Sequence, residues 1–152
     1  MSEPTDPGLP DPPRTIVVGI DGSATSLGAL RWALAEARRS GGRVEAVGAW
    51  QWPTGWGAMA PFPQDYDPAR DTAVMLEELV APLATAVPDV PVGWRAVEGH
   101  PAEVLVAASD HADLLVVGNR GHGSFTGLVL GSVSQHCAAH AATPVVIYRE
   151  GA

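Results

Sequence analysis

Residues 113–133 read DLLVVGNRGHGSFTGLVLGSV, and the rest of the chain can be interpreted outward from them. Their apolar run Leu114–Val117 ends at Gly118, which predicts a short strand buried on both faces of a sheet. The following residues show no apolar periodicity until Leu128, and Gly131-Ser132 then begins a helical pattern. A strand, a glycine-rich loop and a helix N-terminus in this order often bind phosphate, because free backbone N–H groups and the positive end of the helix dipole converge on one point.

The glycines of this stretch have separate expected roles. Gly118 is expected to let the chain turn sharply with a positive φ, while Gly121 and Gly123 leave the N–H groups of the loop accessible to a ligand. Gly131 permits close approach at the helix start, where the Ser132 hydroxyl can bond to a phosphate or cap the helix. Each bond from an amide or hydroxyl to a phosphate oxygen contributes about 1.5–3 kcal/mol. Several such bonds together predict nucleotide binding at micromolar affinity.

Glycine-rich loops between a strand and a helix also occur simply as turns, without any ligand. The string Gly121-x-Gly123-x-x-x-Gly127 resembles a dinucleotide fingerprint, but that motif belongs to an early βαβ unit with an acidic residue about 20 residues later. A P-loop is excluded because the chain contains no lysine, and the same absence excludes lysine Schiff-base chemistry.

A second polar turn follows the first predicted strand, residues 15–20. Asp21-Gly22-Ser23 stands at its carboxyl end, which is where open α/β sheets bind ligands. Asp21 can accept hydrogen bonds from a ribose or a base, or help to hold a divalent ion on phosphates. Alternatively it caps the next helix, for which Ser23 and Ser26 are the other candidates.

The spacing of the two motifs resembles that of a known family. Gly118-x-x-Gly121, nine further residues and Gly131-Ser132 are similar to the nucleotide-binding signature of universal stress proteins, in their ATP-binding branch. The segment VVGIDGS, residues 17–23, is similar to the first strand and turn of that family. The resemblance extends from about Thr15 to Arg149.

The resemblance implies an adenine nucleotide site, with ATP held together with Mg. Arg120 or His122 could touch phosphate, and three positions depart from the common family residues: Gly48 and His122 replace a frequent histidine and arginine, and Ser124 a frequent glycine. The expected nucleotide-binding residues are Gly19, Ile20, Asp21, Ala49, Val117, Gly118, Gly121, His122, Gly123, Gly131, Ser132, Val133 and Ser134.

The predicted fold is α/β, an open five-stranded parallel sheet of order 3-2-1-4-5 with helices on both faces, adenine nucleotide alpha hydrolase-like. In this order the first and fourth strands are neighbours, so that Asp21 and Gly118 face each other at the switch point of the sheet. Residues 14–150 are expected to form the domain, after a disordered proline-rich tail over 1–13. The predicted strands are 15–20, 44–49, 92–98, 114–117 and 145–149, and the helices 25–39, 68–87, 101–109 and 132–141, with Pro82 kinking the second helix or ending it early.

Composition restricts the class of protein. At 152 residues and a net charge of −8, the chain lacks the basic footprint that general nucleic-acid binding requires. It has no apolar run near the ~18 residues of a membrane span. A single cysteine, Cys137, cannot form an intrachain disulfide, and no signal peptide is recognisable. A cytoplasmic location is therefore expected.

Two further features have alternative interpretations. The loop 50–68 holds five of the nine aromatic residues; it is either a cover over the adenine or a partner surface, or else a hydrophobic flap packed on the second helix. His136 and His140 lie one turn apart, but the third ligand of a zinc site is missing, so a packed or surface pair is expected and no metal site is assigned.

Three functions follow. The first is a regulatory nucleotide-binding module in the stress response, acting as a homodimer paired through Val145, Val146, Ile147, Tyr148 and Arg149 of an apolar last strand that needs covering. The second is a slow ATPase, which the lack of a lysine and of an evident general base makes inefficient. The third is a structural dimer whose nucleotide site is vestigial. Catalytic residues are not assigned.

Overall fold

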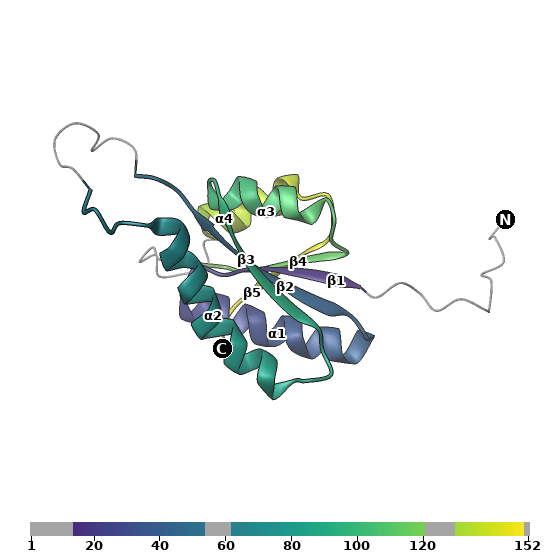
Figure 1. The fold of residues 1–152 in the computed structure, drawn as a ribbon. Helices are drawn as coiled ribbons and strands as arrows, with labels where there is room; N and C mark the ends of the chain where they lie inside the picture. The colour runs from purple at the N-terminus through teal and green to yellow at the C-terminus, as the bar shows by residue number, and fades with distance from the viewer. Residues whose placement is uncertain (1–13, 54–61, 121–129, 151–152) are drawn as a thin grey trace.

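The computed structural model describes residues 14–53, 62–120 and 130–150. Figure 1 shows helices on both sides of a central sheet. The strands, all parallel, lie in the order β3-β2-β1-β4-β5, which confirms the predicted fold and topology. In chain order the elements are β1 (Thr15–Gly19), α1 (Ala24–Ser40), β2 (Arg43–Trp50), α2 (Pro68–Ala86), β3 (Val92–Glu98), α3 (Pro101–Ser109), β4 (Leu114–Gly118), α4 (Ser132–His140) and β5 (Val145–Tyr148).

The two most apolar predicted strands lie side by side in the middle of the sheet. Ile16 of β1 aligns with Leu114 of β4, and Val18 with Val116. All four of these side chains are buried. Because both faces of β1 and β4 are covered, their sequences are continuously apolar and do not alternate with polar residues.

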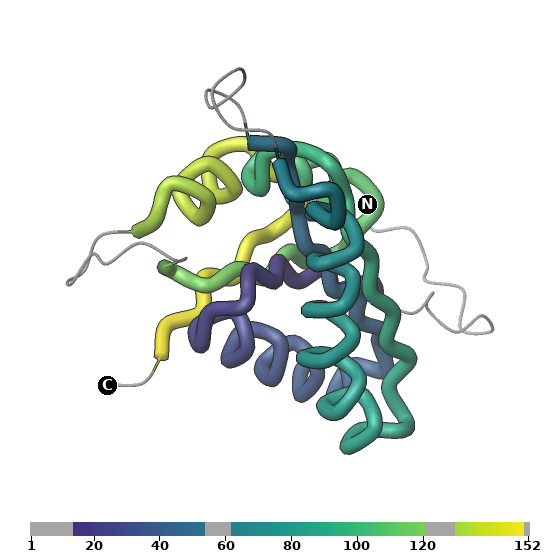
Figure 2. The backbone as a smooth tube through the Cα atoms, turned by 60° about the vertical axis from the view of Figure 1, so that its left-hand side comes forward, coloured from purple at the N-terminus to yellow at the C-terminus, as the bar shows by residue number. Residues whose placement is uncertain are grey.

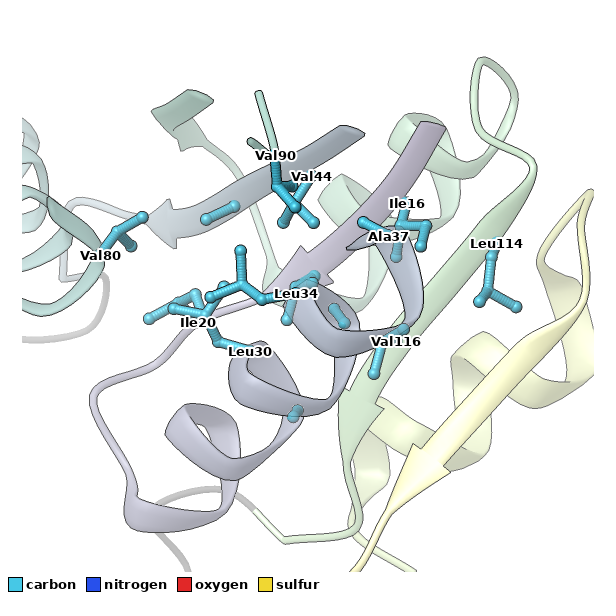
Figure 3. Packing of buried hydrophobic residues seen from close by; sticks show 14 of the residues in the cluster. Ile16, Ile20, Leu30, Leu34, Ala37, Val44, Val80, Val90, Leu114 and Val116 are labelled. Carbon is cyan, nitrogen blue, oxygen red and sulfur yellow. The ribbon is translucent and has the colours of Figure 1, made fainter. Parts of the chain in front are cut away.

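Two hydrophobic clusters form, one on each face. The first joins the sheet to α1 and α2 and includes Ile16, Leu30 and Val80, several of whose members are drawn in Figure 3. The second joins the other face to α3 and includes Leu105, Leu115 and, from α4, Cys137. The turned view in Figure 2 shows the two helical layers on opposite sides of the strands. The predicted two-sided arrangement is thus confirmed.

Most element ends agree with the predicted ends to within about one residue. Gly41 ends α1 in the left-handed conformation at φ 72° and donates its N–H to the Ala37 carbonyl. Of the two predicted effects of Pro82, a kink or an early end of α2, the early end is wrong, because α2 continues to Ala86. Pro82 lies on the exposed side of this helix, away from the core.

In the described part of the chain, none of the helices combines the length and the apolar character that a membrane crossing requires.

Candidate functional site

A cavity of about 580 Å³ opens at the carboxyl ends of β1 and β4, at the switch point of the sheet. The turn after β1, the turn after β4 and the first turn of α4 converge on it. Gly121, His122 and Gly123 lie outside the described residues. The remaining ten expected site residues all line the cavity: Gly19, Ile20, Asp21, Ala49, Val117, Gly118, Gly131, Ser132, Val133 and Ser134.

The turn after β1 is closed by its own side chains. A carboxylate oxygen of Asp21 accepts hydrogen bonds from the Ser23 N–H at 2.9 Å and from the Ser23 hydroxyl at 2.5 Å. The Ser23 side chain in turn caps α1 by accepting from the Ser26 N–H at 3.2 Å. Ser23 is therefore the N-cap of α1, and Asp21 fixes the Ser23 hydroxyl in place.

Ser26 adds a second connection within this turn. Its buried hydroxyl donates to the Ser23 carbonyl at 2.9 Å and accepts the Asp21 N–H at 3.4 Å. The Asp21 carboxylate nevertheless remains at the rim of the cavity, with an exposed side chain. Asp21 thus has a structural role in the turn and a position from which it can reach a ligand.

The turn after β4 corrects one expectation. Among the described glycines, a positive φ occurs only at Gly22, Gly41 and Gly99, so Gly118 does not turn the chain in that way. Gly118 is instead needed for close approach. A Cβ at this position would lie 2.7 Å from Cγ2 of Thr25 and 3.3 Å from the Thr25 carbonyl carbon. The missing side chain lets the end of β4 pack against the start of α1.

The N-terminus of α4 is arranged differently from that of α1. Its N-cap is Gly131, with φ −66° and ψ 164°, and no side chain of the described residues caps it. The Gly131 N–H donates to the carbonyl of Asn119 at 2.8 Å, which holds the helix start beside the end of β4. Ser134 donates its hydroxyl to the Gly131 carbonyl at 3.0 Å.

Ser132 therefore does not cap α4. It is the first helical residue, it is exposed, and it lines the cavity together with Val133. Helix geometry leaves the first N–H groups of α4 without partners inside the helix. The positive end of the α4 dipole and these donors lie at the wall of the cavity, where an anion would be stabilised.

The cavity also has an apolar side. Val47 and Ala49 of β2, Leu105 of α3 and Val117 of β4 line it. Gly48 is not among its lining residues: a Cβ there would lie 3.0 Å from Thr72 and 3.1 Å from Leu76, both on α2. The glycine that departs from the family pattern therefore faces α2, where a larger side chain would require Thr72 and Leu76 to shift.

Several lining residues were missed by the sequence-based prediction. Asn119 is buried directly after β4, and its position next to Gly118 was a usable signal. The others come from helices and strands whose approach only the tertiary structure fixes. Arg120, which the sequence had suggested as a phosphate contact, lines the cavity as well. The missed lining residues are Ser26, Val47, Pro101, Leu105, Asn119, Leu130 and Gln135.

The described aromatic residues of the loop 50–68 do not line the cavity, so they do not support the adenine cover among the three alternatives for this loop. Trp52 packs edge-on against Trp50 at 6.1 Å and against Tyr66 at 5.9 Å between ring centroids. Phe62 stacks on Tyr66 at 5.1 Å. None of these four lines the cavity, while Trp56 lies outside the described residues. They form a cluster in which Trp52 and Phe62 stay exposed.

The remaining candidate groups lie on α4. The ring centroids of His136 and His140 are 4.4 Å apart. In the described residues no three side chains of His, Cys, Asp or Glu lie close enough together to bind a metal ion.

Cys137 is fully buried, and this burial raises the pKa of its thiol to about 11. The thiol is thus neutral near pH 7 and is unsuited to act as a nucleophile.

Comparison with known proteins gives a consistent result. The family model described as the universal stress protein family matches residues 13–149. A universal stress protein of Mycobacterium tuberculosis (strain ATCC 25618 / H37Rv) is 38% identical over 148 residues, which cover 95% of this chain and 49% of the relative. The chain spans about half the length of the curated relatives it matches, 45% of one from Mycolicibacterium smegmatis and 49% of that from M. tuberculosis.

Solved structures agree in fold. A universal stress protein crystallised in complex with cAMP has a TM-score of 0.67 and 31% identity, over 88% of this chain and 95% of that one. The universal stress protein from Archaeoglobus fulgidus in complex with dAMP has a TM-score of 0.61 and 22% identity, over 89% and 97%. The family match over residues 13–149, together with 31% identity over 95% of a solved universal stress protein, leads to one conclusion: the chain belongs to the universal stress protein family.

Proposed function

We propose that this chain is a regulatory module that binds an adenine nucleotide, with ATP as the preferred ligand, in the cavity between β1 and β4. The observation that carries the proposal is the uncapped N-terminus of α4, which lies at the cavity wall beside the end of β4. In a chain of net charge −8, a phosphate group has to be held by local donors. The N–H groups at the start of α4 and the Ser132 hydroxyl supply them.

The two sides of the cavity match the two ends of a nucleotide. The apolar wall of Val47, Ala49 and Leu105 can bury a flat base, and Asp21, which lines the cavity after β1, would accept a hydrogen bond from a ribose hydroxyl. The phosphates would then extend toward Gly131 and Ser132. Support also comes from the relatives solved with cAMP and with dAMP, both of which contain an adenine and a phosphate.

Mg²⁺ fits this site only when the phosphates of the nucleotide supply part of its coordination. Asp21 is the one carboxylate among the described lining residues, and Mg²⁺ characteristically takes one or two carboxylates together with phosphate oxygens and water. Asp21 would supply that single protein ligand. The residues present therefore suit Mg-ATP better than a metal ion bound by the protein alone.

The regulatory output is proposed to involve a homodimer. β5 is an edge strand whose four residues are half-buried, and edge strands of apolar sequence are stabilised by a covering partner. Pairing of β5 with its copy would extend the sheet through Val145–Arg149. Sedimentation velocity should then give about twice the chain mass of 15.7 kDa. A species with the mass of one chain at micromolar concentration would reject the dimer.

The cytoplasmic location and the role in stress response remain predictions.

The first experiment is mass spectrometry of nucleotide released from freshly purified protein, followed by calorimetric titration with Mg-ATP, ADP, AMP and cAMP. We expect copurifying adenine nucleotide and tighter binding of Mg-ATP than of AMP. Failure to find nucleotide, to detect heat of binding, and to raise the melting temperature with Mg-ATP would support the vestigial site instead.

Hydrolysis is tested separately. Phosphate release by the wild-type chain is compared with release by an Asp21→Ala variant under saturating Mg-ATP. If the chain is a regulatory module, we expect no ATP hydrolysis that depends on Asp21. A turnover that is lost in the variant would identify the slow ATPase.

A further inference from the structure

A second groove lies far from the nucleotide cavity in the fold, between the C-terminal halves of α1 and α2. It has a volume of about 470 Å³. Leu34 of α1 and Leu83 of α2, with Val87 just beyond α2, form an apolar floor. Three arginines of α1 surround this floor: Arg31, Arg38 and Arg39. A groove of this kind suits a ligand with carboxylates and an apolar side chain.

Two of the three arginines of the rim, Arg31 and Arg38, are only weakly engaged. Within the described residues no ion pair or hydrogen bond reaches the Arg31 side chain. Arg38 lies 3.3 Å from Asp89, and both of these side chains are more than half exposed. Arg39 donates two hydrogen bonds to the carboxylate of Glu36, whose side chain is 15% exposed, while the Arg39 side chain is 73% exposed. Ion pairs between exposed side chains contribute little to stability, so a new carboxylate can compete for Arg31 and Arg38.

The described chain begins at Arg14, close to the C-terminal turns of α1 that also form one wall of the groove. Arg14, the first described residue, receives the Arg43 N–H on its carbonyl at 2.8 Å. The Arg14 guanidinium lies 3.9 Å from the carboxylate of Glu36, the same carboxylate that pairs with Arg39. The chain therefore emerges alongside the last turns of α1.

The composition of the segment complements the groove. Residues 1–13 read MSEPTDPGLPDPP: three acids, no basic side chain, five prolines and a single leucine. Proline-rich chains favour the extended polyproline conformation, which loses little entropy on docking. The segment also lies almost wholly outside the family match, which begins at residue 13.

The lengths are compatible. At ~3.1 Å per residue for a polyproline chain, Asp11 reaches about 9 Å from Arg14 and Asp6 about 25 Å. Arg31 and Arg39 are separated by about 12 Å along α1, at ~1.5 Å per helical residue. A tethered segment also has an effective concentration of about a millimolar, so weak contacts are enough to hold it.

We propose that the acidic, proline-rich segment 1–13 docks in the groove between α1 and α2, with Asp6 and Asp11 on the arginine rim and Leu9 on the apolar floor. Docking neutralises the arginine cluster and completes the cover over the half-buried side chains of Leu83 and Val87. The inference is independent of nucleotide binding, because the groove and the cavity share no lining residue.

The test uses the full chain with a nitroxide spin label on a Thr5→Cys variant. Cys137 is buried with a raised thiol pKa, and the unmutated chain, which should take up no label, checks that labelling is confined to position 5. Amide signals of residues 31–39 and 83–87 in the ¹⁵N spectrum are then expected to broaden selectively. The broadening should fall in 1 M salt, where the Debye length is only ~3 Å.

Two charge-removing variants and one control complete the experiment. The broadening should be lost in Asp6→Asn/Asp11→Asn and in Arg31→Ala/Arg38→Ala, and kept in Arg70→Ala, which removes an arginine at the other end of α2. Broadening that is absent, that persists in both double variants, or that spreads over the whole surface would overturn the proposal. So would broadening seen only when spin-labelled chains are mixed with separate ¹⁵N chains, since the segment would then dock on another copy.

Discussion

Two helix N-termini meet at the same edge of the sheet, and they are built in opposite ways. α1 begins in a turn whose donors are satisfied internally: Asp21 holds the hydroxyl of Ser23, and Ser23 caps the helix. α4 begins at a glycine that offers no side-chain cap. Both turns line one cavity. We therefore expect the open end of α4, and not the capped start of α1, to hold a phosphate, because position at the switch point does not by itself supply donors that are free for an anion.

The largest expected effect comes from placing a negative charge at the uncapped end. Ser132→Asp puts a carboxylate in the first turn of α4, where it occupies the donors and repels phosphate. We expect the affinity for Mg-ATP to fall by about 100-fold, or ~2.7 kcal/mol. The folded protein should be as stable as before or more stable by ~0.3–1 kcal/mol, because an acid suits this end of the dipole. Calorimetric titration and thermal melting measure the two effects.

The matched control is Ala24→Asp, which adds the same charge to the exposed first residue of α1. Ala24 does not line the cavity, so nucleotide affinity should change little. Equal losses of affinity in both variants would mean that general repulsion matters and that the open end of α4 has no special role.

A second test targets the contact that brings the two turns together. Gly118→Ala places a Cβ 2.7 Å from Cγ2 of Thr25, next to backbone that cannot yield easily. Overpacking of this kind costs about 1–3 kcal/mol of unfolding free energy. Gly93→Ala is the control, because a Cβ at Gly93 of β3 meets no atom within 4 Å. Urea unfolding that shows the same small change for both would contradict the close approach.

The rate at which a thiol reagent modifies Cys137 measures how strongly a bound nucleotide would keep α4 closed. Its thiol has a pKa of about 11, raised from 9.0, so at pH 8 the buried group is protonated and unreactive. Modification by a thiol reagent then requires α4 to open. Nucleotide at ten times its Kd should slow this reaction by about 10-fold, if opening abolishes binding.

The pH dependence of the same thiol has a definite sign. Between pH 9 and about 11 the folded state holds its proton more tightly than the unfolded chain does, so stability should fall as pH rises through this window. Cys137→Ser is the control and should lack that part of the decline. Rapid modification of native protein at pH 8, unaffected by nucleotide, would show that α4 is not held closed.

The smallest expected effect separates the two caps. Ser23→Ala removes the N-cap of α1 and the partner of Asp21, at a cost of ~1 kcal/mol in unfolding free energy. Ser132→Ala should change stability by less than about 0.5 kcal/mol, because this exposed side chain caps nothing. Chemical denaturation of the pair checks the contrast. Comparable destabilisation by both substitutions would assign a capping role to Ser132 after all.

Local pattern was sufficient for much of the fold. The apolar runs of β1 and β4 predict central strands because a strand covered on both faces cannot alternate with polar residues. The positions of Asp21 and Gly118 at the ends of these strands then predict a shared site, since carboxyl ends of parallel strands meet at one edge. All ten described candidates line the cavity, although their contact with nucleotide stays a prediction.

Prediction failed where a residue's role depends on a distant neighbour. Gly118 was expected to serve its own backbone conformation, but it makes room for Thr25, more than ninety positions earlier in the chain. For the loop 50–68 the sequence left three alternatives open, and only the tertiary structure shows that its described aromatic residues pack on one another. Leu105 reaches the cavity through the placement of α3, which sequence spacing does not encode.

The features that could be derived from the chain alone are periodic or local: buried strands, helix starts and stops, the glycine and aspartate turns, and the acidic balance of charge. They depend on neighbours along the chain and on the spacing of apolar residues. Three-dimensional packing was needed to establish that the start of α1 is capped while the start of α4 stays open. It was also needed to bring the arginine-lined groove and Arg14, the first described residue, to the C-terminal part of α1. Those outcomes depend on contacts between residues far apart in sequence, whose distances are set by how the helices and the sheet pack together.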